Sequence, residues 1–318
     1  MIIPQSAEHR DCVVSDRGGI VENTHLIHVA VTDASGQILF AVGNPARITL
    51  ARSTAKPIQI LALLETKGFE SSEESHITRG TEMLVKVAAS EKDLRCGGHP
   101  ALSEAVNRDW IRRDFVPGAL CNNCSAKHIG MLAGAKAIDP ENAENYHEGD
   151  HMMQLCVKAV FEEDLSYLYA VLADAADSPK GTDSLESGRK EKLARIYRAM
   201  WQYPEMVAGQ GRFCTELMLQ YKGGLVGKLG ADGCYGIAVK ESEQTRNLGA
   251  RGGLGIAVKV EDGDSEILYA VVVEVLERLK VGSSKQLENL DVFHHLTRVN
   301  TAGVVTGRVS LDFRLNSC

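Results

Sequence analysis

Alternating hydrophobic residues near the N-terminus predict a pair of β-strands. HLIHVAVTD (residues 25–33) is rich in β-branched side chains, and Ala34-Ser35-Gly36 supplies a turn before the returning strand QILFAVG. Strand-like segments with glycine turns return after Gly223, in GGLVGKLGADGCYGIAVK and GGLGIAVKV, and RVNTAGVVTGRVSLDFRL indicates a last strand at the C-terminus. The pattern therefore places strands at both ends of the chain.

The middle of the chain has the spacing of helices. TLARSTAKPIQILALLETKGF predicts a helix that begins near Ser53, with Pro57 in its first turn, where a missing N–H breaks no intrahelical bond. Further helices are expected in the segments EMLVKVAAS, SAKHIGMLAGAKAI, LARIYRAMWQY and SEILYAVVVEVLERL. Residues 177–192 are polar and rich in Ser and Gly, and we expect them to form an exposed connection.

This order of elements predicts an α+β fold, with an antiparallel sheet closed from both termini and flanked by helices. No repeat, low-complexity tract or clear linker divides the chain. We therefore expect residues 1–318 to form a single domain.

Composition limits which classes of partner and which cellular compartment we expect for the chain. The net charge of -7 argues against a nucleic-acid partner, and no run approaches the roughly 18 apolar residues that a membrane helix needs. The opening residues lack the features of a secretory signal, so a cytoplasmic location is expected. The eight scattered cysteines are then expected to be reduced thiols.

The first candidate for chemistry is Ser53-Thr54-Ala55-Lys56, an S-x-x-K pattern. At a helix start, residues three apart share a face, so the Lys56 amine can take the proton of the Ser53 hydroxyl if burial or a second cation lowers its pKa. The pattern alone is weak, because Ser187-Gly188-Arg189-Lys190 is a second match and because serine commonly caps helices.

Lys228, in the strand-like GLVGKLGADG, is the second candidate. It resembles the lysine of the K-T-G element that faces the S-x-x-K helix of penicillin-recognising enzymes. It could supply the second cation beside Lys56 or bind a substrate carboxylate. The alternative is an ordinary lysine at a strand end.

The third candidate is CNNCSAKHIGM, where Cys121 and Cys124 precede Lys127 and His128. Thiolates and imidazoles are zinc ligands, but a structural zinc site usually has four such ligands and no second cluster is present. Two buried structural thiols are the alternative, and a redox pair lacks its usual βαβ context.

Longer stretches carry a resemblance to one family. The segments SDRGGIVENTHLIHVAVTD, GNPARITLARSTAKPIQ, DLRCGGHPALSEAVNRDWIRRDFVP, CNNCSAKHIGMLAGAKAI, PEMVAGQGRF, VGKLGADG and RVNTAGVVTG are, in this order, similar to the Rhizobium etli-type L-asparaginases of bacteria and fungi. The resemblance runs from near residue 10 to near residue 315.

The resemblance implies a fold like that of serine β-lactamases and glutaminases, a homodimer, and hydrolysis of L-asparagine to L-aspartate and ammonia. It implies that Ser53 is the nucleophile, Lys56 its base, and Lys228 the lysine of a second Ser–Lys pair. By the same resemblance, the metal ligands for zinc are Cys124 and Lys127, and Arg52 and His128 are substrate-pocket residues.

Two family segments have no counterpart in the chain. The segment that carries the serine paired with Lys228 would fall between Glu70 and Ser71, and the segment that carries an aspartate and a zinc cysteine would fall between Asp164 and Leu165. We therefore expect weak zinc binding or none, unless Cys121 takes the vacant place.

Two further hypotheses remain open. The missing segments favour a catalytically inactive asparaginase paralogue that acts as a dimer partner. A serine protein acylated by β-lactams is the third hypothesis, which the absence of an S-D-N element weakens.

Overall fold

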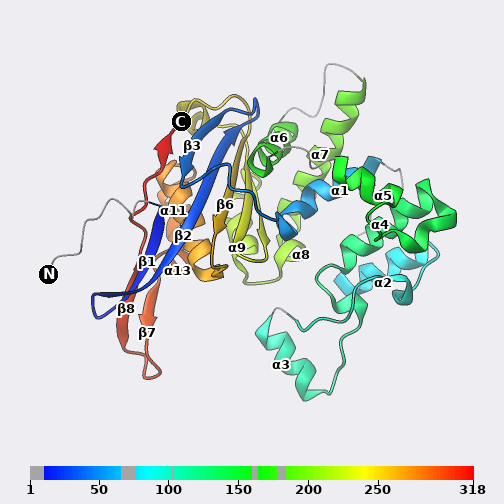
Figure 1. Ribbon diagram of the computed structural model, residues 1–318, viewed down its shortest axis with the longest axis horizontal. Coiled ribbons are helices and arrows are strands. Elements are labelled where there is room, and N and C mark those ends of the chain that lie inside the picture. The colour runs from blue at the N-terminus through cyan, green and yellow to red at the C-terminus, as the bar shows by residue number, and fades with distance from the viewer. Residues whose placement is uncertain (1–10, 66–75, 102, 160–163, 178–183) are drawn as a thin grey trace. The chain divides into compact units, whose positions relative to one another are not determined.

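The computed structural model describes residues 11–65, 76–101, 103–159, 164–177 and 184–318 (Figure 1). The chain forms two compact units, one made of Met1–Ala55 with Glu163–Cys318 and the other of Lys56–Glu162. That they act as a single domain stays a prediction. None of the described helices is both long and apolar enough to cross a bilayer.

A nine-stranded antiparallel sheet forms the centre of the first unit. Its main order is β4-β5-β6-β2-β1-β8-β7, and β3 pairs with β2 and with β9. The strands are β1 (Cys12–Arg17), β2 (Ile20–Asp33), β3 (Ile38–Val42), β4 (Leu225–Gly230), β5 (Cys234–Val239), β6 (Leu254–Val260), β7 (Thr297–Val299), β8 (Val305–Ser310) and β9 (Asn316–Ser317). This sheet, flanked by helices, confirms the predicted α+β fold.

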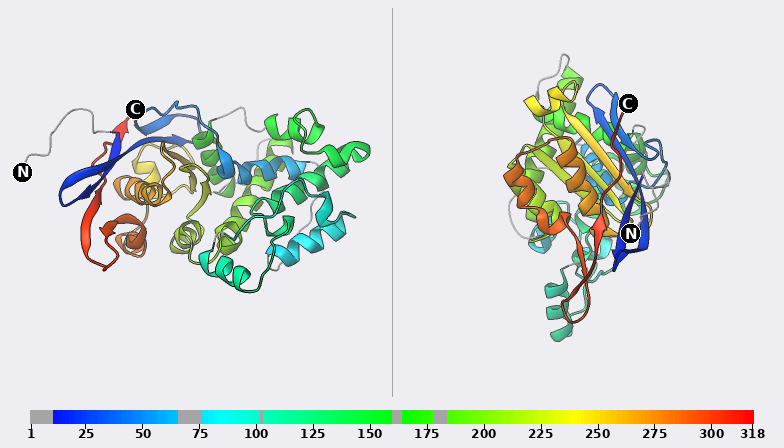
Figure 2. Two further views of the ribbon diagram at one scale, coloured as in Figure 1. Left: turned by 60° about the horizontal axis from the view of Figure 1, so that its bottom comes forward. Right: turned by 90° about the vertical axis from the view of Figure 1, so that its left-hand side faces the viewer.

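The long strand β2 joins the two ends of the chain. Its first half pairs with β1, and its second half pairs with β6 and β3, so the predicted N-terminal strand pair is confirmed as β2 and β3. The C-terminal segment forms a hairpin of β7 and β8 rather than one strand, and β8 pairs with β1. Strands from both ends of the chain are thus neighbours in this sheet, as Figure 2 shows, but the sheet does not close, because β4 and β7 lie at its two edges.

Helices cover both faces of this sheet. On one face of the sheet, a Cβ built at Gly236 or Gly255 would meet α6 (Leu165–Asp177). On the opposite face, a Cβ built at Gly227 would meet Leu217 of α9 (Phe213–Tyr221). Helix α11 (Ser265–Arg278) lies with α9, because Phe213 and Tyr269 stack with ring centroids 4.5 Å apart. The other helices of this unit are α7 (Ser184–Gln202), α8 (Pro204–Ala208), α10 (Glu243–Asn247), α12 (Ser284–Glu288) and α13 (Asp291–His294), with the 3-10 turn η2 (Arg52–Ala55).

The exposed connection predicted over residues 177–192 is wrong from Ser184 onward, where α7 begins. Its early residues include Glu, Arg and Lys, which are good helix formers and make a solvated face. The helix is anchored further along by the buried side chains of Ile196 and Tyr197. Residues 178–183 lie outside the described residues.

The second unit is helical where it is described. It contains α1 (Lys56–Glu65), α2 (His76–Lys86), η3 (Glu91–Asp93), α3 (Glu104–Arg112), η4 (Ala119–Cys121), α4 (Ser125–Ile138), η5 (Pro140–Asn145) and α5 (Met152–Ala159). Helix α4 has the bounds that the sequence predicts, and its buried residues Ile129 and Leu132 lie in the core, where α4 packs against α1, α2 and α5.

Candidate active site

Ser53 lies in a tight 3-10 turn rather than in the helix that the sequence predicts. The turn is η2, and α1 begins only at Lys56. Arg52, exposed and directly before Ser53, has a φ of 54°, in the left-handed region that non-glycine residues rarely adopt. Thr54 is fully buried and its N–H donates to the Ala51 carbonyl at 3.2 Å, while Ser53 stays partly exposed.

The sheet of the first unit holds this turn in place. The buried Tyr169 hydroxyl of α6 donates to the Thr54 carbonyl at 2.8 Å, and the Cys234 thiol of β5 donates to the Leu50 carbonyl at 3.4 Å. A Cβ built at Gly230 would lie 3.0 Å from both the Ala51 carbonyl oxygen and Thr54 Cγ2. Glycine at the end of β4 therefore allows the close approach of the Ser53 turn.

Lys228 lies on the same face of the sheet as this turn. It is two residues before Gly230, so both side-chain positions project to one side of β4. It pairs in register with Gly236, whose own side-chain position faces Tyr169. Its ammonium is partly buried and donates to the Leu229 carbonyl at 3.2 Å. The first unit thus brings together the Ser53 turn and Lys228, two sites far apart in the sequence.

Lys56, in the second unit, has an environment that favours a neutral amine. Its Nζ donates to the Asn123 carbonyl at 2.9 Å. Burial lowers the pKa of Lys56, the charge of Lys127 lowers it further, and Cys124 opposes both through its charge and a hydrogen bond. The net direction is downward, as a general base needs.

Cys124 and Lys127 flank the start of α4, beside Lys56. Cys124 is the N-cap residue, and its backbone N–H donates to the Asn122 side-chain oxygen Oδ1 at 2.8 Å. Cys96, which no sequence pattern selects, lies close to both: burial raises the pKa of its thiol, Cys124 raises it further and Lys127 lowers it. No local spacing could reveal Cys96, because it lies far before Cys124 in the sequence.

Within the described part of the chain, the residues around Cys124 do not make up a complete set of zinc ligands. Among the described residues, no group of three or more His, Cys, Asp or Glu side chains with converging ligand atoms contains Cys124 or Cys121. The Cys124 thiol has the Lys56 amine as a hydrogen-bond partner. The donor set therefore does not fit a closed four-ligand zinc centre.

Tyr146 orients the imidazole of His128, and burial keeps that imidazole neutral. Its Nδ1 lies 2.8 Å from the Tyr146 hydroxyl, and that hydroxyl accepts the Arg95 N–H at 2.8 Å. Because the Tyr146 hydroxyl already accepts from Arg95, we assign it as the donor to an unprotonated His128 Nδ1. The N–H of the neutral ring is then at Nε2. Burial, followed by the charges of Lys127, His147 and Lys56, lowers the pKa of His128 from 6.5 to about 4.

The predicted site residues thus fall into two sets. Arg52, Ser53 and Lys228 belong to the first unit, and the second unit holds Lys56, Cys124, Lys127 and His128. Ser71 and Ser72, near the first missing segment, lie outside the described residues, as do residues 160–163 just before the second.

The chain matches the model of a known family. The model of the family described as L-asparaginase II matches residues 13–167 and 163–311, and so covers nearly the whole chain. The two matched stretches meet at residues 163–167, which include the junction of Asp164 with Leu165. No curated protein matches the chain.

Proposed function

The chain belongs to the L-asparaginase II family, and we propose that it hydrolyses the side-chain amide of L-asparagine through an acyl-enzyme on Ser53. Family membership supports an amidohydrolase that acts on asparagine. The assignment of Ser53 and Lys56 is the finer part of the proposal. The observation that carries it is the partly buried Lys56 amine, with its lowered pKa, three residues after Ser53.

In the first half-reaction, the Ser53 hydroxyl attacks the amide carbon and passes its proton to the neutral Lys56 amine. Backbone N–H groups at the turn would stabilise the negative charge on the amide oxygen. The carbon–nitrogen bond then breaks, and the proton on Lys56 goes to the departing nitrogen, which leaves as ammonia.

In the second half-reaction, water attacks the ester carbon and gives a proton to Lys56. The bond between the carbon and the Ser53 oxygen breaks, and the proton returns to that oxygen. L-Aspartate leaves and the enzyme regains its starting state.

The remaining residues are assigned to binding and electrostatics. Lys228 would keep the site cationic and so favour the neutral form of Lys56 or bind the substrate carboxylate. Arg52 and the Nε2–H of neutral His128 would donate hydrogen bonds to the substrate. No step of this mechanism uses a metal, and we infer that Cys124 and Lys127 bind zinc weakly.

The test is an ammonia-release assay with L-asparagine. Wild type should turn over, and Ser53→Ala should lose at least a hundredfold in kcat, because the nucleophile is gone. Ser187→Ala, which removes the serine of the other S-x-x-K match, is the control and should keep wild-type activity. Equal rates for wild type and Ser53→Ala would refute the nucleophile assignment.

A second function is favoured by the missing segments. In this alternative the chain is a catalytically inactive paralogue that forms a mixed dimer with an intact relative. It predicts no turnover by the purified chain and co-elution of the two chains after co-expression. Turnover by the purified chain alone would exclude it, and a self-associated chain would support the homodimer that the family resemblance implies.

A further inference from the structure

His294, at the end of α13 in the first unit, is a buried imidazole that faces two glutamates. Its side chain is 4% exposed, and its Nε2 lies 2.7 Å from Glu274 Oε2. Its Nδ1 lies 3.8 Å from Glu277 Oε2. Both glutamates belong to α11. A carboxylate therefore faces each ring nitrogen.

Glu274 is fixed by a second partner. Arg278 donates from Nε to Glu274 Oε1 at 2.6 Å and from a terminal nitrogen to the Leu311 carbonyl at 2.5 Å. The Arg278 guanidinium also lies 4.4 Å from the centre of the Phe313 ring. Glu274 is therefore an ionised acceptor that is oriented toward the N–H at His294 Nε2. When the ring is neutral, its lone pair is then on Nδ1.

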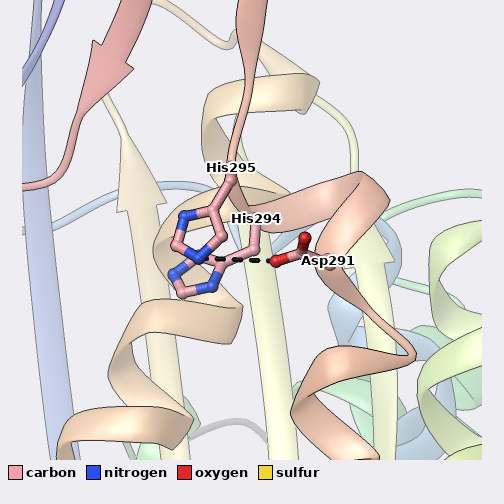
Figure 3. A group of neighbouring side chains, drawn as sticks. All are labelled: Asp291, His294 and His295. Atoms are coloured by element: carbon pink, nitrogen blue, oxygen red, sulfur yellow. Dashed lines mark ion pairs between the residues drawn. The ribbon is translucent and has the colours of Figure 1, made fainter.

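This arrangement is typical of metal-binding histidines. Such imidazoles commonly donate the N–H of one nitrogen to a carboxylate, which fixes the tautomer and directs the other nitrogen at the metal. Asp291 and His295 lie beside His294, and one ligand atom from each of the three falls within 4.8 Å of the others (Figure 3).

We propose that the end of α13 binds a divalent ion of the zinc class. The ligands are the Asp291 carboxylate, His294 Nδ1, the His295 imidazole and, as a fourth, the Glu277 carboxylate. Nitrogen and carboxylate oxygen are both established zinc ligands. The site is separate from Cys124 and Lys127, which belong to the other unit.

Binding needs only the exposed side chains to move. Ligand atoms around a tetrahedral zinc ion are about 3.3 Å apart, since each lies about 2.0–2.1 Å from the metal. His295 and Asp291, 3.4 Å apart, are 68% and 60% exposed and are free to rotate. The rings of His294 and His295 are stacked at 4.2 Å, so His295 must turn until its lone pair converges with that of the buried His294.

The charge of the cluster also fits a dication. The positive charge of Arg278 compensates Glu274. Asp291 and Glu277 contribute two negative charges, and the two imidazoles are neutral when they bind a metal. A divalent ion would therefore neutralise the site and join α11 to α13, ahead of β7.

The test is a zinc titration of the full chain after treatment with a chelator, followed by calorimetry and metal analysis. Wild type should bind one zinc ion, and Asp291→Asn and His295→Gln should each weaken binding at least tenfold. Both residues are exposed, so these variants should keep the fold. With Co²⁺ in place of zinc, the spectrum should lack a thiolate charge-transfer band, because no cysteine is a ligand.

Two further variants make the result decisive. His147→Gln is the matched control, because His147 lies near a single carboxylate, that of Glu148 at 3.1 Å. This variant should bind zinc as wild type does. Cys124→Ser should also leave binding unchanged. The proposal is wrong if wild type binds no zinc, if Asp291→Asn and His295→Gln both bind normally, or if Cys124→Ser alone abolishes binding.

Discussion

The Lys56 amine donates a hydrogen bond to the backbone carbonyl oxygen of Asn123, 2.9 Å away and 67 residues later in the chain. This bond fixes the amine at the start of α1 against the loop before α4. A neutral amine has two N–H bonds and one lone pair. It can therefore keep this hydrogen bond and still accept a proton, which is what the proposed general base must do.

The first prediction concerns Lys56 itself. Lys56→Arg keeps a cation and its hydrogen-bonding capacity but cannot deprotonate near neutral pH, so kcat for ammonia release should fall by about 10²–10⁴. Lys127→Arg, which changes a neighbouring cation in the same way, is the control and should retain most activity. Comparable activity of Lys56→Arg and wild type would contradict the assignment.

The lowered pKa of Lys56 also sets the direction of the pH profile. The reactive form is the neutral amine, so the rate should rise with pH through the pKa of Lys56 and then level off. Because burial lowers that pKa, the rise should come at lower pH than an ordinary lysine would give. A profile that keeps rising to the usual lysine range would show that Lys56 is not the base.

His128 should make stability depend on pH. Its pKa is 6.5 when the chain is unfolded and about 4 in the fold, so between these values the unfolded chain binds a proton that the native state does not. The contribution of neutral His128 to the free energy of unfolding is fully present above pH 6.5 and is lost as pH falls towards 4. For this partly exposed ring the loss should be ~1–3 kcal/mol.

Urea unfolding at several pH values measures this loss. His128→Gln, which cannot titrate, should show a smaller fall in the free energy of unfolding between pH 6.5 and 4 than wild type. The ring of His128 should titrate by NMR with a midpoint near 4. An unchanged fall in the variant would refute the assigned role of this imidazole.

Gly230 should be needed for the position of the Ser53 turn. In Gly230→Ala the new Cβ lies 3.0 Å from the Ala51 carbonyl oxygen and must displace the turn, so stability should fall by about 1–3 kcal/mol and activity should fall with it. Gly188→Ala is the matched control, since a Cβ there meets nothing within 4 Å and lies in α7. Thermal unfolding and the ammonia assay on both variants test this.

The sequence predicts those parts of the fold and site that depend on local patterns. The alternation around Val29 and the apolar spacing in α4 determine their own elements, and the S-x-x-K pattern selects Ser53 and Lys56 as candidates. What it misses depends on tertiary packing. Tyr146 becomes a partner of His128 only through the path of the chain after α4, and no spacing rule predicts that contact.

The same limit explains two of the errors in secondary structure. The helix at Ser53 is predicted from its apolar face, but the close approach of β4 and the bond from Tyr169 hold residues 52–55 as a tighter turn. The polar start of α7 resembles a loop in composition. It is nevertheless the first part of a helix whose later turns carry buried side chains.

The last prediction isolates that hydrogen bond from Tyr169. The Tyr169 hydroxyl is buried and donates to the Thr54 carbonyl at 2.8 Å, next to Ser53. Tyr169→Phe keeps the ring in the core but leaves the carbonyl without this donor, which should cost about 1–3 kcal/mol in the free energy of unfolding. Because the turn is then less well fixed, kcat should fall several-fold while the KM for asparagine changes little.

Tyr167→Phe, two positions before Tyr169 in α6, is the matched control. Its hydroxyl makes no hydrogen bond within the described part of the chain, so its removal should change stability by less than about 0.5 kcal/mol. Urea unfolding measures the change in the free energy of unfolding, and the ammonia assay measures the change in kcat. If Tyr169→Phe loses stability but keeps full kcat, the bond supports the core alone and the position of Ser53 does not depend on it.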